Sequence, residues 1–509
     1  MRTIDVRLLA ITLIATAGLS ALVALTAARR CKNKHDYFLA GRQLGWLPLA
    51  FTLVATQLGA GMILGGSEEA FAAGVTGLFY SAGMALGFVV LGCGVAAKLQ
   101  DLGICTTAEL FETRYGSRQL RLLASLLSVI TLGGLLTGQV VASMQILGPI
   151  AGEWTTGLLA VLWVVLIAYT MFGGLSAVVA TDVLQVGVIV VVLLAVFGMC
   201  LLNSADPLPP NAWLSTRAGD TPAVPWHRWQ SLLLMPACYS LIEQDLAQRF
   251  FAGKSKRAAV ISTFVAAVVL LCLALLPAYF GLKARALVPL STPLPDGANP
   301  LLVLVDSLGS RLLTAMTLCA LLAAISSTAD SLLCAIASNV VYDFGRAGKT
   351  RLSQNVASAG TARQKLPRKR NLCGINEHSE TIFNEGGASG VVLRQPEMWV
   401  SRAVTVVVGI TALGLAPYAG GILQVMVMSY TLSVSCLFVP LMACLVKQRV
   451  YAQAAFTSCV LGLGGFLWAL AHAPEGESPE ALFALALSLL GYVVADRWMR
   501  LSHRAIINP

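Results

Sequence analysis

The sequence predicts an all-α integral membrane protein with about 13 transmembrane helices, and three observations lead to this fold class. Of the 509 residues, 57% are hydrophobic and only 12% are charged, whereas soluble domains carry about 25% charged residues. The apolar residues form runs of about 20, the length that crosses a bilayer core. The basic residues lie mostly between these runs. Because a water-soluble particle could not bury so much apolar surface, lipid is the expected solvent.

The individual spans follow from the apolar runs. The first run could be taken for a cleaved signal peptide, but it is longer than a signal core. Arg29 and Arg30 follow it at once, which favours a stop-transfer helix. The predicted spans lie near residues 7–27, 46–66, 77–98, 122–148, 156–173, 183–202, 229–251, 258–280, 310–343, 400–418, 420–446, 453–472 and 480–498.

The distribution of Lys and Arg predicts the orientation. Connectors after odd-numbered spans hold most of these residues, while the even connectors are poorer in them. Since cytoplasmic loops carry the excess of Lys and Arg, we expect the N-terminus outside and the C-terminus in the cytoplasm. The same distribution explains the net charge of +10 without a nucleic-acid partner. No N-x-[ST] sequon occurs, which fits a bacterial chain and a location in the cell (inner) membrane.

One long polar segment interrupts the spans. Residues 344–398 carry nine Lys and Arg against four Glu. We expect a long cytoplasmic loop here, and a solvated linker is favoured over a regulatory segment.

The second predicted span is too rich in glycine and polar residues for a simple anchor. Thr56 and Gln57 are followed by Gly59 and Gly61. Small residues allow close helix packing, but they also permit unwinding that frees carbonyl oxygens at membrane depth. Freed carbonyls need a filling group such as an ion, a substrate or a protein partner. The residues leave both interpretations open.

The ninth span is polar along the run from Ser326 to Ser331. The hydroxyls of Ser327 and Thr328, with the carbonyl of Ala324 one turn earlier, form a compact set of hard oxygen ligands, which suit alkali and alkaline-earth cations. The alternative is a Ser/Thr pair that bonds back to its own helix. The neighbouring Asp330 makes a cation site the favoured interpretation, because a buried acid in a span is costly unless it has a function.

Other intramembrane polar groups are Gln139, Asp182 and the run from Glu243 to Arg249. The last could be an interfacial ion-pair network or part of a permeation path. The twelve cysteines include no CxxC pair and no Cys/His cluster, so no metal centre or disulfide framework is indicated. A nucleophile elbow, a metal motif and a phosphate-binding loop are also missing from the sequence, which argues against an enzyme.

Four segments in register resemble the sodium:solute symporter family, whose members carry proline, pantothenate, sugars, choline or carboxylates. The resemblance covers roughly residues 1–450. The segments are Phe38-Leu39-Ala40-Gly41-Arg42; Gly173-Gly174-Leu175 with Thr181-Asp182-Val183-Leu184-Gln185; Gln248-Arg249 with Ala252 and Lys254-Ser255; and Ser327-Thr328-Ala329-Asp330-Ser331.

The resemblance implies an inverted-repeat transporter fold built from two five-helix halves. The implied organisation has a first helix and connector at 1–45, a first repeat at 46–202 and the first three helices of the second repeat at 203–343. The loop 344–398 follows. The last two helices of the second repeat lie at 399–446, and two peripheral helices lie at 447–509.

The resemblance also implies a site for Na⁺, the expected coupling ion, between the second and ninth spans. Its ligands would be the carbonyls of Ala55, Leu58 and Ala324 and the hydroxyls of Ser327 and Thr328. Asp182 matches a family aspartate associated with sodium exit, and we group Asp330 with it as a candidate gating residue. Tyr239 falls where sugar-carrying relatives place an inner-gate aromatic. The candidate solute-binding residues are Gln57, Met62, Gln139 and Tyr239.

Departures from the family pattern narrow the expected solute. Gln57 replaces the aromatic of choline carriers and the aspartate of proline carriers, while Met62 and Pro236 replace the amides of sugar carriers. A small polar or anionic solute is therefore expected.

Two alternatives to sodium-coupled symport remain. A proton-coupled carrier of the same shape would use Asp330 or Asp182 as its titrating group. A membrane sensor that borrows the fold is disfavoured, because only about ten residues follow the last predicted span. We expect a monomer or weak homo-oligomer.

Overall fold

The computed structural model describes residues 6–28, 34–203, 208, 210–214, 230–288, 294, 298–345, 396–472 and 481–507. Within these residues the secondary structure is helical, and an isolated bridge joins Leu44 to Gly253. The α-helices are α1 (Val6–Ala28), α2 (Lys34–Leu39), α3 (Trp46–Gln57), α4 (Gly66–Ala73), α5 (Phe79–Val90), α6 (Ala96–Asp101), α7 (Thr107–Tyr115), α8 (Arg118–Ala151), α9 (Thr155–Asn203), α11 (Met235–Ser240), α12 (Gln244–Ala252), α13 (Lys256–Leu287), α14 (Pro300–Ser307), α15 (Arg311–Asn339), α17 (Pro396–Leu415), α18 (Ile422–Ser433), α19 (Val439–Val446), α20 (Ala452–His472) and α21 (Ala481–Ile507).

Nine helical segments in the described part of the chain are long and apolar enough to cross a membrane. This makes the chain a multi-pass membrane protein, while the count of thirteen spans stays a prediction. The loop predicted at 344–398 lies almost entirely outside the described residues. The nine segments are Gly61–Asp101, Arg118–Ala168, Gly173–Asn203, Lys256–Leu287, Arg311–Phe344, Trp399–Tyr418, Ile422–Val446, Ala452–His472 and Ala481–Ser502.

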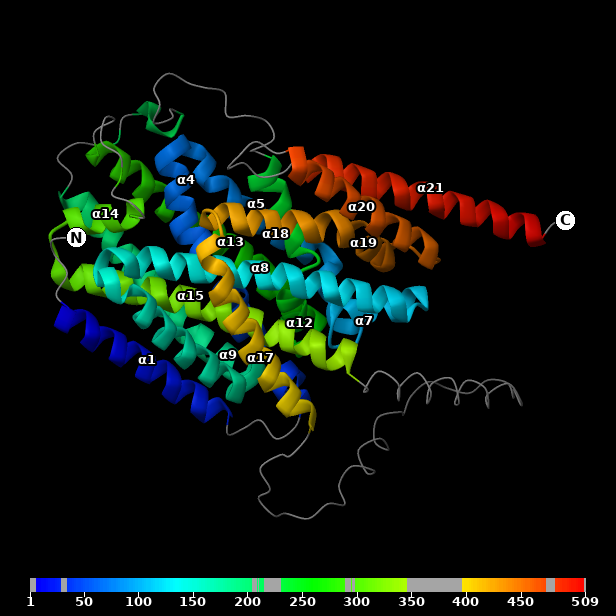
Figure 1. The fold of residues 1–509 in the computed structure, drawn as a ribbon, viewed down its shortest axis with the longest axis horizontal. Helices are drawn as coiled ribbons and strands as arrows, with labels where there is room; N and C mark the ends of the chain where they lie inside the picture. The colour runs from blue at the N-terminus through cyan, green and yellow to red at the C-terminus, as the bar shows by residue number, and fades with distance from the viewer. Residues whose placement is uncertain are drawn as a thin grey trace, which may run out of the picture.

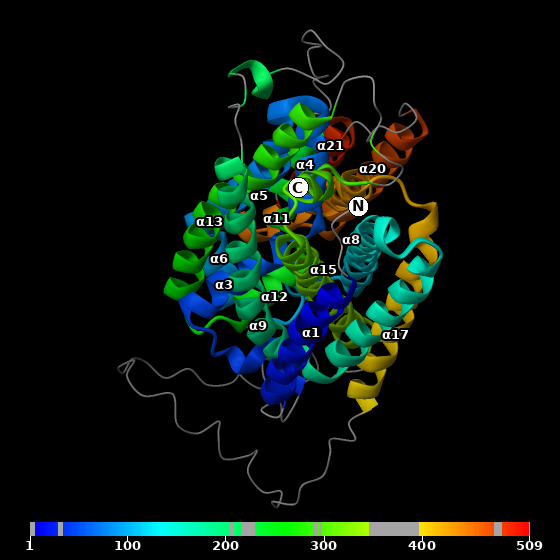
Figure 2. The same cartoon turned by 90° about the vertical axis from the view of Figure 1, so that its left-hand side faces the viewer.

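Helix α15 occupies the centre of the bundle. It packs against α1, α3, α8, α9 and α17, and the end view shows it surrounded by other helices (Figure 2). Its side chains from Leu313 to Asn339 are nearly all buried. A helix enclosed by protein in this way can carry polar side chains without exposing them to lipid. The polar run of the ninth predicted span therefore lies inside the bundle.

Two helices are interrupted at glycine-containing segments. Helix α3 ends at Gln57, Leu58 leaves the helical conformation with φ −80° and ψ 45°, and a π-helical turn follows at Gly61–Gly65. Of the two interpretations left open for the second span, the interruption is present here. Helix α9 contains both the fifth and sixth predicted spans and bends at Gly174, whose φ of 55° and ψ of −163° suit glycine. A Cβ there would lie 2.5 Å from the carbonyl oxygen of Tyr37.

The C-terminal helices α20 and α21 pack against each other, as the orange and red ribbons show (Figure 1). They also contact the segment around Val434–Phe438. The residues expected to bind sodium lie elsewhere, at the crossing of α3 and α15.

Candidate functional site

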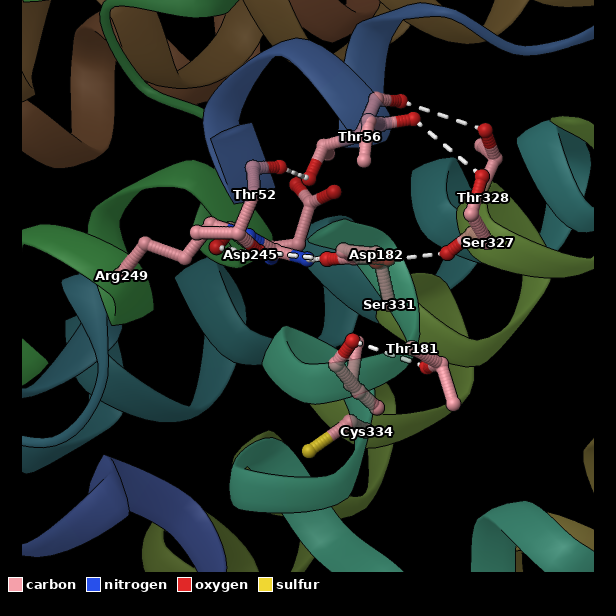
Figure 3. A network of polar contacts seen from close by, with 12 residues as sticks. Thr52, Thr56, Thr181, Asp182, Asp245, Arg249, Ser327, Thr328, Ser331 and Cys334 are labelled. Carbon is pink, nitrogen blue, oxygen red and sulfur yellow. Dashed lines mark hydrogen bonds and ion pairs between the residues drawn. The ribbon is translucent and has the colours of Figure 1, made fainter. Parts of the chain in front are cut away.

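The break after α3 meets the polar run of α15 in the buried interior. The Ser327 hydroxyl lies 3.4 Å from the carbonyl oxygen of Ala55, and the Thr328 hydroxyl lies 3.3 Å from that of Thr56 (Figure 3). Both hydroxyls also lie near the carbonyl oxygen of Ala324, at 3.0 and 3.2 Å. Carbonyl and hydroxyl oxygens from two helices therefore converge on one region.

The two interpretations of the Ser/Thr pair coexist in this geometry. Each hydroxyl has a single hydrogen, yet each lies within reach of one carbonyl on its own helix and one on α3. The hydrogen can fully satisfy only one of them. A bound cation would interact favourably with the several oxygens at once, as hard oxygen ligands do.

Gly59 allows the close approach of the two helices. A Cβ at this position would lie 2.5 Å from the Thr328 hydroxyl oxygen. Any larger residue would push Thr328 away from the break. The glycine is therefore explained by helix contact as well as by the interruption.

Four of the five predicted sodium ligands meet in these contacts: Ala55, Ala324, Ser327 and Thr328. Leu58, the fifth, is the first residue beyond α3 and is fully buried. Whether these groups bind sodium stays a prediction.

A small cavity lies beside the crossing. It offers about 20 Å³ to the centre of a water molecule, enough for one or two waters. Among the predicted residues, Gln57, Gln139 and Thr328 line it. The side-chain oxygen of Gln139 accepts a hydrogen bond from the backbone N–H of Ala60 at 3.3 Å, so this residue also caps the broken helix. The full lining is Thr56, Gln57, Gly59, Gly61, Tyr80, Met84, Leu135, Gln139, Glu243, Thr328, Leu332, Met426 and Tyr430.

The other two candidate solute residues lie outside the lining. Tyr239 stacks on Tyr430, with ring centroids 4.4 Å apart. Met62 is buried in the π-helical turn after the break. Neither belongs to the lining of the small cavity, and their solute-binding roles stay predictions.

A charged network lies one helical turn away from the oxygen cluster. Arg249 donates to the Thr52 hydroxyl at 2.8 Å, to the Ser331 hydroxyl at 2.6 Å and to the Asp245 carbonyl at 2.9 Å. It also forms a 3.3 Å ion pair with Asp182, which accepts from Thr52 at 2.5 Å (Figure 3). The Asp182 and Arg249 side chains are fully buried. Asp182 of α9 therefore contacts α3 through Thr52. Through Arg249 of α12 it is also linked to Ser331 of α15.

Asp330 lies elsewhere on α15 from this network. It is fully buried and accepts a hydrogen bond from Thr170 of α9. The two gating candidates, Asp182 and Asp330, thus both connect α9 to α15, but through different partners.

Polar contacts also lie toward both ends of the bundle. Near α14, Ser67 donates to Asn299 at 3.1 Å. Near α7, Arg121 forms a 2.7 Å ion pair with Asp343. Helices α14 and α7 lie at opposite ends of the long helices (Figure 1).

Six residues of the cavity wall, among them Tyr80, Tyr430 and Met426, were not predicted from the sequence. Tyr80 and Tyr430 bring their hydroxyls 2.7 Å apart, and the Met426 sulfur lies 3.5 Å from the Tyr80 hydroxyl. A tyrosine in mid-span is a weak signal that could have drawn attention to Tyr80 and Tyr430. Met426 has no such signal, since methionine is an ordinary core residue.

Comparisons with known proteins agree with this geometry. The sodium:solute symporter family model matches residues 37–355, well over half of the chain. The chain is 28% identical over 193 residues to a sodium/glucose cotransporter of Vibrio parahaemolyticus, covering 36% of this chain and 34% of the relative. It is 31% identical over 183 residues to the sodium/iodide cotransporter of Homo sapiens (36% and 28% covered). It is 33% identical over 157 residues to the sodium/pantothenate symporter of Escherichia coli K12 (30% and 32% covered).

These matches span about a third of the length of the curated relatives. The relatives are transporters rather than enzymes, as the sequence predicts.

Solved structures match over nearly the whole chain. A Na⁺-coupled sialic acid symporter in a substrate-bound, outward-open state has a TM-score of 0.71 at 18% identity, with 96% of each chain covered. Mhp1, a nucleobase-cation-symport-1 family transporter in a closed conformation, has a TM-score of 0.59 at 13% identity, covering 92% of this chain and 95% of that one. At these identities the likeness shows the fold, which is the predicted inverted-repeat transporter fold. The chain belongs to the sodium:solute symporter family.

Proposed function

We propose that this protein is a secondary active transporter that couples the inward movement of Na⁺ to the uptake of a small organic solute by alternating access. The observation that carries the proposal is the meeting of the Ser327 and Thr328 hydroxyls with α3 carbonyls at the break. Family membership and the named sodium cotransporters support the same coupling ion.

In the proposed mechanism, sodium is held by the carbonyls of Ala55, Leu58 and Ala324 and the hydroxyls of Ser327 and Thr328. The ion would link α3 to α15 more firmly than the 3.3–3.4 Å contacts do alone. Because the same break borders the cavity, sodium binding would also complete the solute pocket. The loaded bundle would then change from outward-open to inward-open.

The driving force for one sodium ion is sufficient for concentrative uptake. The membrane potential contributes about 2.3 kcal/mol per charge per 100 mV. A tenfold sodium gradient adds about 1.4 kcal/mol. At tight coupling, one ion would support a solute accumulation of roughly a few hundredfold.

We further propose that sodium leaves toward the cytoplasm past Asp182 and Asp330, which connect α9 to α15. Gln57 and Gln139 would contact the solute in the cavity, and Tyr239 would support its wall by stacking on Tyr430. Met62 would complete the solute site. The Lys and Arg distribution supports an orientation with the N-terminus outside and the C-terminus in the cytoplasm. The membrane would be the inner membrane of a bacterial cell. The working unit would be a monomer or a weak homo-oligomer, in the domain organisation given by the two repeats.

The test is counterflow of purified protein in liposomes against amino acids, vitamins and carboxylates, with sodium replaced by potassium at fixed pH. Sodium-dependent exchange of at least one solute is expected. Exchange that persists unchanged in potassium would exclude sodium coupling.

A proton-coupled carrier is the second candidate, favoured by the buried carboxyl groups of Asp182, Asp245 and Glu243 near the site. In the same liposomes, uptake driven by a pH gradient without sodium would support this candidate. Uptake that needs sodium at every pH would exclude it.

A further inference from the structure

We propose that the solute carries a positively charged nitrogen and that the carboxylate of Glu243 binds it. The inference rests on the proposed function, because it assigns a substrate class to the same cavity. It also opposes the anionic solute that the sequence left open.

Glu243 reaches the cavity from a second interruption of the bundle. Helix α11 ends at Ser240 and α12 begins at Gln244, with Glu243 in extended conformation between them (φ −61°, ψ 128°). The side chain lines the cavity, is 5% exposed, and accepts a hydrogen bond from the Gln57 amide at 2.9 Å. A carboxylate is thus presented to the space where α3 is broken.

Two charged side chains, Asp245 and Arg249, interact with Glu243. Asp245 interacts with Glu243 and lies close to it, so a second acid adds negative charge. Arg249 is the nearby base, but its hydrogen bonds go to Thr52, Ser331, Asp182 and the Asp245 carbonyl. These buried side chains amount to three acids and one base.

Buried charges are stable only when they are paired. Sodium at the α3–α15 crossing and a solute ammonium group next to Glu243 would each supply a positive charge to this acidic cluster.

A second, independent observation concerns the other side of the cavity. Among the described residues, the side-chain nitrogen of Gln139 has no hydrogen-bond partner, although the residue is 1% exposed and lines the cavity. A buried amide N–H without a partner is costly, and a solute acceptor oxygen would satisfy it. The cavity therefore offers an acceptor at Glu243 and a donor at Gln139.

The rest of the wall suits an ammonium group as well. Tyr80, Tyr430 and Met426 line the same space. Aromatic faces attract cations, and none of these three side chains carries a positive charge that would repel one. The groups around the cavity match a small amine with an oxygen acceptor, such as an amino acid or an amino alcohol, and the cavity of about 20 Å³ would widen to admit it.

The experiment measures the thermal unfolding midpoint of the purified full-length protein with a fixed set of compounds, in sodium and in potassium buffer. The set contains three ammonium compounds (glycine, 4-aminobutyrate and ethanolamine), two anions without nitrogen (acetate and butyrate) and neutral glycerol. We expect stabilisation by at least one ammonium compound, and by neither anion nor glycerol. Stabilisation by the anions alone, or by no compound at all, would overturn the inference.

Two variants sharpen the test. Glu243→Gln keeps the shape and the contact with Gln57 but removes the charge, so the half-saturating concentration of the ammonium compound should rise at least about tenfold. Glu69→Gln is the matched control, since Glu69 is equally buried but accepts from Thr76 away from the cavity. Equal affinity in Glu243→Gln and the unaltered protein would contradict the assignment.

The outcomes separate this inference from the proposed function. Ammonium binding that is equal in sodium and potassium would leave the Glu243 assignment in place and contradict sodium coupling. Sodium-dependent binding of an anion would contradict the Glu243 assignment and leave sodium coupling in place.

Discussion

Helices α3 and α15 meet at two junctions that differ in chemistry although they lie one helical turn apart. At the first, Ala55 and Thr56 face Ser327 and Thr328 through neutral contacts of 3.3–3.4 Å. At the second, Thr52 and Ser331 are joined by Arg249 through bonds of 2.8 and 2.6 Å. Positions four residues apart on a helix share a face, so the same two faces form both junctions.

The strengths of these contacts indicate which junction can exchange its partner. Neutral contacts longer than 3.2 Å are weak hydrogen bonds, and an entering cation can replace them. Charge-assisted bonds are shorter and roughly twice as strong. We therefore expect the charged junction to hold the helices in register while the neutral junction opens and closes around sodium.

The largest effect is expected when the charged junction is broken. Arg249→Met would leave the buried Asp182 without its ion-pair partner, which costs about 3–5 kcal/mol. Thermal unfolding of the purified variant should show a large loss of stability. The matched control is Arg257→Met, at an exposed position. An unchanged unfolding midpoint in Arg249→Met would show that this junction does not hold the helices.

A smaller effect is expected when the neutral junction is forced apart. Gly59→Ala would place a Cβ 2.5 Å from the Thr328 hydroxyl oxygen, so Thr328 must move away from α3. We expect the sodium concentration for half-maximal uptake to rise more than about tenfold, a loss above about 1.4 kcal/mol. Gly133→Ala is the control, because nothing lies within 4 Å of a Cβ there. Normal sodium dependence in Gly59→Ala would place the ion elsewhere.

The smallest effect is expected when single hydroxyls of the neutral junction are removed. Ser327→Ala and Thr328→Ala should each raise the half-maximal sodium concentration up to about tenfold, or about 1.4 kcal/mol. Membrane insertion should remain intact, since one hydrogen bond contributes only about 1 kcal/mol. Ser262→Ala is the control, as this buried hydroxyl bonds its own helix at 2.9 Å in α13. If both variants kept the original sodium dependence, these hydroxyls would not be ligands.

The sequence was sufficient for the fold class and for the neutral junction. Apolar runs predict membrane helices because the bilayer imposes their length. The polar run at Ser327 and the glycines near Gln57 are local signals, and both lie where the structure brings two helices together.

The charged junction and the cavity wall could be predicted only in part. Asp182 and Arg249 stood out as charges in apolar surroundings, but their pairing depends on how distant helices pack. Thr52 and Tyr80 look like ordinary span residues, and only the packing shows that one joins Asp182 and the other faces Tyr430. The fifth and sixth predicted spans lie on the two sides of the bend at Gly174, where the backbone is not helical.

The bridge between Leu44 and Gly253 has a mechanical consequence. Leu44 donates to the Ala252 carbonyl at 3.1 Å and accepts from the Lys254 N–H at 2.8 Å. These bonds tie the start of α3 to the end of α12, the helix that carries Arg249. A rotation of α3 by itself would break both, so we expect the two helices to turn as one rigid body. The opening of the neutral junction would then come from a tilt of α15 about the charged junction, with the Arg249–Ser331 bond kept.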